Sequence, residues 1–142
     1  MQPDLVIQMY RSMLTIRLFE EKVKQLYQAG EVAGAIHLSI GQEAVAVGVC
    51  SALRLDDAVF STHRGHGHLI AKGGQLPAMM AELMGRQTGC SRGCGGSMHM
   101  FDVQVGFMGG NGIVGACLTL ALGAAFAAQY RGRDGIAVAF FG

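Results

Sequence analysis

The order of apolar segments in the second half of the chain restricts the fold more than any other feature of the sequence. A short apolar segment predicts a strand over residues 57–62, and a continuous apolar run predicts a strand buried on both faces over residues 136–141. Between them lie a glycine-rich stretch, residues 85–112, and a small-residue segment that predicts a helix over residues 115–130. Strands that alternate with helices are typical of an α/β fold, with a parallel sheet flanked by helices.

The first half of the chain adds helices to this fold. Apolar positions at helical spacing predict a helix from Pro3 to Gln28 that stops at Gly30, and further helices are expected over residues 43–53 and 75–84. The stretch 85–112 holds nine glycines and little periodicity, so we expect a long irregular loop there. A loop of that length in a compact domain is usually functional. We expect the 142 residues to belong to a single domain.

The composition indicates a surface that something else covers. Apolar residue types make up 51% of the chain and charged types 15%, against about 25% charged residues in an average soluble domain. We therefore expect other chains, or further sequence, to bury part of the surface. The net charge of +1 gives no electrostatic footprint for nucleic acid or anionic lipid.

The sequence favours a cytoplasmic protein. The start, Met1 to Asp4, lacks the basic residues and the apolar run of a signal peptide. The apolar segment Gly112–Ala128 is shorter than the roughly 20 residues that a membrane span needs, so we interpret it as a buried core helix. The cysteines are too sparse for a disulfide scaffold, and we expect them to be reduced: they are Cys50, Cys90, Cys94 and Cys117.

The segment from Ser61 to His68, S-T-H-R-G-H-G-H, is the first candidate for a binding site. It follows directly on the first predicted strand, and ligands of α/β sheets bind beyond the carboxyl ends of strands. The planar guanidinium of Arg64 is suited to phosphate, because its donors match two oxygens at once. The alternative is a solvated turn whose histidines fill polar corners.

Two other patterns admit alternative sites. The histidines of this segment, with Cys90, Cys94 and His99, suggest zinc, but their spacing does not match a structural zinc site, and small apolar cysteines in a tight loop are the better interpretation. The run G-N-G-I-V-G, residues 110–115, matches the dinucleotide fingerprint and opens a predicted helix. That fingerprint also needs an acidic residue at the end of the next strand, whereas Asp134 precedes the strand. A nicotinamide-binding Rossmann domain therefore remains only the alternative.

Five ordered motifs and the closing V-A-F-F-G give the chain a family resemblance. The motifs are I-H-L-S-I-G-Q-E-A (36–44), S-T-H-R-G-H-G-H (61–68), A-E-L-M-G-R (81–86), G-G-S-M-H-M (95–100) and G-G-N-G-I-V-G-A (109–116). Together they resemble the alpha subunit of thiamine diphosphate-dependent 2-oxo acid dehydrogenases, which include pyruvate, branched-chain and acetoin dehydrogenases. The motif T-H-R-G-H-G-H is most similar to the acetoin type. Cys94 stands where this family usually has lysine, so the electrostatics of this loop differ from the family pattern.

The resemblance implies a thiamine diphosphate-binding fold and a role for each of five residues. His63 and Arg64 would contact the diphosphate of the cofactor. Gly112 would allow close backbone approach to its middle, and Val114 would support its folded conformation. His37 would lie on the substrate side, as the candidate catalytic residue. The reaction implied is cleavage of pyruvate, a related 2-oxo acid or acetoin, with transfer of the acyl group to lipoamide.

The resemblance also implies components that this chain lacks. A beta subunit would complete the active site in an assembly of two alpha and two beta subunits, and a lipoyl-bearing acyltransferase would receive the acyl group. None of the residues named above is expected to bind metal, because in this family the Mg²⁺ ligands would lie beyond residue 142. We therefore expect the chain to be an N-terminal fragment that is inactive alone.

Overall fold

The computed structural model describes residues 3–142 and has an α/β architecture, as the order of segments predicted. The first two residues, on which the expectation of no signal peptide partly rests, lie outside the described part. The elements in chain order are α1 (Pro3–Gln28), α2 (Glu43–Cys50), β1 (Ala58–Thr62), α3 (His66–Ala71), α4 (Leu76–Leu83), a 3₁₀ turn (Val103–Val105), β2 (Phe107–Asn111), α5 (Ala116–Tyr130) and β3 (Ala137–Ala139).

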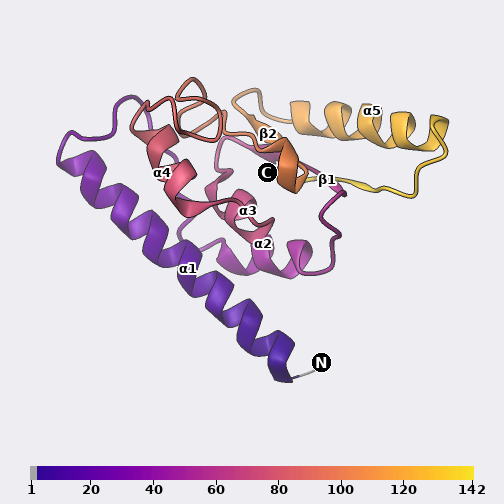
Figure 1. Ribbon diagram of the computed structural model, residues 1–142, viewed down its shortest axis with the longest axis horizontal. Helices are drawn as coiled ribbons and strands as arrows, with labels where there is room; N and C mark the ends of the chain where they lie inside the picture. Colours follow the sequence, from indigo (N-terminus) through magenta and orange to yellow (C-terminus); the bar gives the residue numbers. More distant parts are fainter. Residues whose placement is uncertain (1–2) are drawn as a thin grey trace.

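The three strands form a parallel sheet in the order β2-β1-β3. The central strand, β1, pairs Val59 with Phe107 on one side and with Val138 on the other. Figure 1 shows the sheet between α5 and the group of helices α1 to α4. Because all three strands run the same way, their carboxyl ends meet at one edge, where α3 and α5 begin after β1 and β2.

The core lies between the sheet and the helices α1, α2, α3 and α4. Its fully enclosed side chains include Ile16 of α1, Leu69 of α3, Met79 of α4, Val59 of β1 and Phe107 of β2. These five positions come from five elements, so the core joins the long first helix to the sheet. Burial of each such side chain contributes about 1.5–3 kcal/mol.

The structure differs from the predicted elements in three places. The helix α2 ends at Cys50 and not at residue 53, because the amides of Ala52 and Leu53 donate to carbonyls three residues back, which tightens the last turn. The helix α3 was not predicted, because it has only six residues and two of them are histidines. The strand β2 lies inside the stretch predicted to be an irregular loop, and pairing with β1 stabilises it despite its two glycines.

Two segments predicted to be buried are more exposed than expected. In α5 only Cys117 and Ala121 are buried, whereas large apolar side chains such as Leu122 and Phe126 are 71% and 66% exposed. The helix therefore covers one side of the sheet with a narrow stripe and is not a buried core helix within this chain. The strand β3 is half-buried at the edge of the sheet.

In residues 3–142, no helix combines the length and the apolar character needed to cross a membrane.

A single buried carboxylate organises the glycine-rich loop after α4. Glu82 is completely enclosed, and its two oxygens accept four backbone N–H groups of the loop, from Ser91, Gly93, Gly95 and Gly96, at 2.7–3.2 Å. An enclosed carboxylate is tolerated only when its oxygens are hydrogen-bonded. The loop is therefore irregular in its dihedral angles but held in one conformation.

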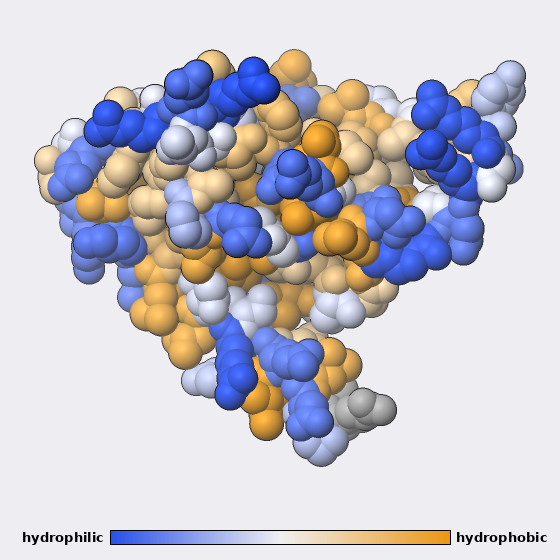
Figure 2. Space-filling model, viewed as in Figure 1, coloured by the Kyte–Doolittle hydropathy of each residue, from blue (hydrophilic) through white to orange (hydrophobic). Residues whose placement is uncertain are grey.

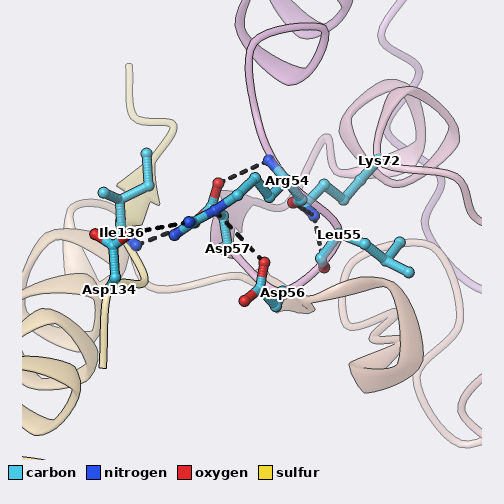
Figure 3. A network of polar contacts seen from close by, with 7 residues as sticks. All are labelled: Arg54, Leu55, Asp56, Asp57, Lys72, Asp134 and Ile136. Carbon is cyan, nitrogen blue, oxygen red and sulfur yellow. Dashed lines mark hydrogen bonds and ion pairs between the residues drawn. The ribbon is translucent and has the colours of Figure 1, made fainter. Parts of the chain in front are cut away.

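Another buried carboxylate connects β1 and β3 at the opposite, amino-terminal edge of the sheet. Asp57 accepts hydrogen bonds from the backbone amides of Arg54 at 2.7 Å and Ile136 at 3.1 Å. The guanidinium of Arg54 lies 3.5 Å from Asp57 and 3.1 Å from Asp134, so it bridges the segments that precede the two strands (Figure 3). Lys72 at the end of α3 donates to the carbonyl of Arg54 at 2.6 Å. These contacts fix where β3 starts.

We predict that Asp57→Asn destabilises the full-length protein by about 1–3 kcal/mol at pH 7, because the two backbone N–H groups bond to different carboxylate oxygens and an amide has only one acceptor oxygen. Burial would raise the pKa of Asp57, but the bonds from Ile136 and Arg54 outweigh it and hold the pKa below its ordinary value. A carboxyl group whose pKa is lower in the folded state stabilises the fold at pH values above its unfolded-state pKa. This stabilisation is lost as the pH falls through the folded-state pKa. Urea unfolding should therefore show the deficit at pH 7 and a smaller one below about pH 4.

The matched control is Asp56→Asn, because the side chain of Asp56 is 78% exposed and lies 3.6 Å from Arg54. An exposed substitution of this kind should change the free energy of unfolding by no more than about 0.5 kcal/mol. Equal effects of the two substitutions, or a deficit for Asp57→Asn that does not change with pH, would contradict this account of the β1–β3 connection.

Candidate functional site

A cavity of about 530 Å³ opens at the carboxyl end of β1, where the chain leaves the sheet. Ligands of open α/β sheets occupy this edge. The walls come from the start of α2, the end of β1, the first half of α3, the turn before α5 and the segment after β3. The lining residues are Gln42, Val45, Thr62, His63, Arg64, His68, Val114, Phe140, Phe141 and Gly142.

The end of β1 positions the two candidate diphosphate ligands. Thr62 is the last residue of the strand, and its hydroxyl accepts the backbone amide of Arg64 at 3.2 Å, which bends the chain into a turn. This turn places His63 and Arg64 side by side on the cavity wall. Arg64 Nη1 donates to the carbonyl of Leu38 at 2.8 Å, which anchors the side chain. Within residues 3–142, its Nε and Nη2 groups have no hydrogen-bond partner, and they remain able to bind a ligand.

The charges around the cavity favour an anionic ligand. Arg64 is the cation of the lining, and the lining contains no Asp or Glu. A guanidinium that faces a cavity free of carboxylates is a strong site for phosphate oxygens. The apolar part of the lining, which includes Val45, Val114 and Phe141, can take the uncharged part of such a ligand.

His68 forms a rigid part of the cavity wall. Its ring stacks on Phe140 with centroids 3.8 Å apart, and its Nδ1 is hydrogen-bonded to the hydroxyl of Ser61 at 2.7 Å. Burial lowers the pKa of His68 to about 4, so its imidazole is neutral at physiological pH. His68 therefore adds shape and a polar edge to the site, but no positive charge.

His37 lies behind His63 and does not line the cavity itself. The two rings meet edge to face with centroids 4.8 Å apart. His37 Nδ1 is fully buried and has no hydrogen-bond partner in the described part of the chain. Burial, followed by the electrostatic effects of His63, Arg64 and His66, lowers the pKa of His37. A neutral imidazole with an unsatisfied buried nitrogen is suited to a polar ligand group.

The G-N-G-I-V-G turn is split between the cavity and its surroundings. The strand β2 ends at Asn111, whose side-chain oxygen accepts the amide of Ile113 at 2.8 Å and shapes the turn into α5. Val114 lines the cavity and is 75% exposed. Gly112 lies beside the ring of His99 and outside the lining; an added Cβ would be 3.5 Å from that ring. The structure thus brings together His63, Arg64 and Val114, with His37 one ring further away.

The nicotinamide alternative is not favoured. Its strand, glycine turn and helix are present as β2, the turn and α5, but the acidic residue that would bind a ribose is missing from the site. Asp134 lies at the amino end of β3 and pairs with Arg54, at the opposite edge of the sheet from the cavity. In the part of the chain that the structure describes, no three His, Cys, Asp or Glu side chains are arranged to hold a metal ion.

Residues 10–142 match the family described as "Dehydrogenase E1 component". That match covers most of the chain, together with the cavity and every site residue named above. The chain belongs to the dehydrogenase E1 component family. The resemblance read from the motifs is therefore confirmed at the level of the family, and the fold that it implied agrees with the parallel sheet and its flanking helices.

Named relatives of this E1 family chain include both acetoin and pyruvate enzymes. The alpha subunit of acetoin:2,6-dichlorophenolindophenol oxidoreductase from Bacillus subtilis is 53% identical over 134 residues, covering 94% of this chain and 40% of that protein. The pyruvate dehydrogenase E1 component subunit alpha of Rhizobium meliloti is also 53% identical, over 133 residues, covering 94% and 38%. That of Zymomonas mobilis is 52% identical over 138 residues, covering 96% and 39%. The chain thus spans about two fifths of the length of these relatives.

Several residues that shape this E1 family site were not predicted from the sequence. Gln42 and Val45 line the cavity from the first turn of α2 and its approach, and Phe140 supports His68. The buried carboxylates Glu20 and Glu82 lie on helices, where an acidic residue normally indicates a solvated face. The one sequence signal for their burial is helical spacing: Glu20 follows the apolar Ile16 by four residues, and Glu82 follows the apolar Ala78 by four, so each carboxylate lies on the same side of its helix as that residue.

Proposed function

We propose that this chain is part of the alpha subunit of a thiamine diphosphate-dependent dehydrogenase, which cleaves pyruvate, a related 2-oxo acid or acetoin. The observation that carries the proposal is the cavity at the carboxyl end of β1, in a member of the E1 family; Arg64 and His63 line it, and its lining side chains include no Asp or Glu. Its cationic turn fits a diphosphate, and its apolar lining fits the uncharged rings of the cofactor. Transfer of the acyl group to lipoamide belongs to the same proposal.

Each site residue has a distinct task in this proposal. Arg64 clamps the diphosphate through its free Nε and Nη2 groups, and His63 donates beside it. Val114 presents an apolar wall to the middle of the cofactor, and Gly112 keeps the turn that carries Val114 free of a side chain. When bound, thiamine diphosphate supplies the carbon nucleophile and the electron sink for cleavage beside the oxo group.

His37 is the proposed catalytic residue of this chain. Its lowered pKa keeps the imidazole neutral near pH 7, so it can donate one hydrogen bond and accept another. Its buried Nδ1 has no partner among residues 3–142, and a bridging water is proposed to satisfy it. His37 would thus orient the substrate and hold a proton at one ring nitrogen, close to the bond that breaks.

The remaining parts of the site are proposed to come from outside these 142 residues. The Mg²⁺ that accompanies the diphosphate would take its protein ligands beyond residue 142, and residues 1–142 would be the first part of one thiamine diphosphate-binding domain. A lipoyl-bearing acyltransferase would accept the acyl group. The four free thiols favour a reducing compartment, and the proposal places the enzyme in the cytoplasm.

A beta subunit is the proposed cover for the exposed apolar side of α5. Leu118, Leu122, Phe126 and Tyr130 of this helix are 45–84% exposed. Figure 2 shows tan and orange, hydrophobic atoms along this part of the molecule, next to the blue, hydrophilic turn that follows α5. A helix that is apolar on all sides is normally buried, and exposed apolar surface of this extent marks an interface.

We predict that Arg64→Ala weakens thiamine diphosphate binding by the assembled, full-length enzyme roughly 10- to 150-fold, because a charge-assisted hydrogen bond contributes about 1.5–3 kcal/mol. Arg64→Lys should recover only part of the affinity, since an ammonium cannot bind two oxygens in a fork. Isothermal titration with thiamine diphosphate and Mg²⁺ measures both. Arg86→Ala, at an exposed position outside the cavity, is the control. Unchanged affinity in Arg64→Ala would remove Arg64 from the site.

A second prediction concerns assembly. Phe126→Glu should weaken association of the full-length chain with its beta partner at least about tenfold, because a charge would replace an aromatic side chain in the interface. Gln28→Glu adds the same charge at an exposed position of α1, away from α5, and should leave association almost unchanged. Sedimentation velocity of the mixed subunits distinguishes them, and equal assembly of both variants would exclude Phe126 from the interface.

A further inference from the structure

A chain of buried polar side chains runs beneath the candidate site and connects three distant segments of the sequence. Glu20 of α1 accepts from His66 Nδ1 of α3 at 3.0 Å, and His66 Nε2 is hydrogen-bonded to the hydroxyl of Ser97 in the glycine-rich loop at 3.0 Å. Glu20 and His66 are completely enclosed, and Ser97 is 7% exposed. We call these three residues the Glu20–His66–Ser97 network.

The other oxygen of Glu20 holds a fourth segment in place. Glu20 Oε1 accepts both the amide of Ser39 at 2.9 Å and its hydroxyl at 2.7 Å. The amide of Gly67 in turn donates to the hydroxyl of Ser39 at 3.2 Å. An added Cβ on Gly67 would lie 2.8 Å from that hydroxyl oxygen, so only glycine permits this approach. One carboxylate therefore connects α1 and α3 to the loop that contains residues 37–39.

His37 lies on this clamped loop. Its backbone amide donates to Ser97 Oγ at 3.0 Å, and the next two residues are fixed by Arg64, at the Leu38 carbonyl, and by Glu20, at Ser39. Three consecutive residues without regular secondary structure are thus each held by a side chain from elsewhere in the sequence. The orientation of the His37 ring beside His63 follows from this backbone placement.

The hydrogen bonds of the network form one consistent set. The amide of His37 donates to Ser97, the hydroxyl of Ser97 donates to His66 Nε2, and His66 Nδ1–H donates to Glu20, so each donor meets one acceptor. Burial would raise the pKa of Glu20, but its bonds to His66 and Ser39 outweigh burial and lower it, so the carboxylate is ionised. A fully satisfied buried network holds its members rigidly, whereas loss of one member leaves costly unpaired groups.

The hydrogen bonds link a serine to a histidine and that histidine to a glutamate, as in the catalytic triad of a hydrolase. The surroundings of the three residues exclude that role here. The hydroxyl of Ser97 already accepts the His37 amide, and both it and His66 are buried. None of the three residues lines the cavity. A nucleophile needs access to its substrate and a free line of attack, and Ser97 has neither.

We propose that the Glu20–His66–Ser97 network positions His37 and holds its imidazole against His63, which lines the cofactor cavity. The inference rests on the proposed function for its catalytic consequence only. A misplacement of about 1 Å in a reacting group can cost on the order of 100-fold in rate. The network residues would act through His37 and would not touch substrate or cofactor.

The test compares two buried serines of the same loop in the assembled, full-length enzyme. Ser97→Ala removes the bonds to His37 and His66, whereas Ser91→Ala, at 5% exposure, removes bonds to the backbone of Phe101. Both variants lose a buried hydroxyl, so a general loss of stability affects both. Diethyl pyrocarbonate modification of His37, followed at several pH values by peptide mass spectrometry, reports the exposure and the pKa of its imidazole without requiring activity.

In Ser97→Ala, His37 should be modified at least about fivefold faster than in the unsubstituted enzyme, and its pKa should move up toward the ordinary value near 6.5. Ser91→Ala should leave the modification rate and the pKa of His37 unchanged. The kcat of Ser97→Ala should fall about 10- to 100-fold, while its affinity for thiamine diphosphate should stay within about threefold of that of the unsubstituted enzyme. Ser97→Thr keeps the hydroxyl and should restore the normal modification of His37, which provides a second readout if Ser97→Ala folds poorly.

The possible outcomes distinguish the positioning role of the network from the catalytic role of His37. Equal modification of His37 in Ser97→Ala and Ser91→Ala, or failure of Ser97→Thr to restore it, would overturn the positioning role. Faster modification of His37 in Ser97→Ala with an unchanged kcat would leave the positioning role standing and refute the catalytic role of His37. If Ser97→Ala, but not Ser91→Ala, lost affinity for thiamine diphosphate, the network would support the cofactor-binding residues. That result would contradict its assignment to His37.

Discussion

The burial of the Glu20 carboxylate is the constraint on which the rest of this structure depends. An enclosed carboxylate without partners costs several kcal/mol, so the first helix can pack against α3 only when His66 and Ser39 supply their hydrogen bonds. This requirement brings the loop of residues 37–39 and the turn after β1 to one place. The placement of His37 and the contact of Arg64 with the Leu38 carbonyl follow from it.

Polar burial of this kind limited what the sequence could reveal. The long helix α1, its end before Gly30 and the strand β1 were predictable, because the apolar spacing and the glycine mark them directly; Gly30 indeed has a φ of 77°. The strand β2 and helix α3 were not, since tertiary pairing and buried histidines stabilise them. Arg64, His63 and Val114 were identified through family motifs, whereas the roles of Glu20 and Glu82 depend on backbone groups that the sequence does not specify.

Contacts that stabilise the fold lie at the amino-terminal ends of the strands, whereas the candidate site lies at their carboxyl-terminal ends. At the amino-terminal edge, Asp57 and Arg54 fix the start of β3 through contacts with the backbone and with Asp134 (Figure 3). At the carboxyl-terminal edge, the chain leaves β1 and β2 through turns that present Arg64 and Val114 to the cavity. The exposed apolar side of α5 runs between these edges, so a partner that covers α5 would also be close to the cavity (Figure 1).

The central claim is that the turn after β1 holds the diphosphate of the cofactor. A structure of the assembled, full-length enzyme with thiamine diphosphate and Mg²⁺ tests it most directly. The account predicts diphosphate oxygens within about 3 Å of the Arg64 guanidinium, with the His37 ring beside the cofactor. Diphosphate bound elsewhere, for example in the cavity beside Arg131 and Arg133 near the amino end of β3, would contradict it.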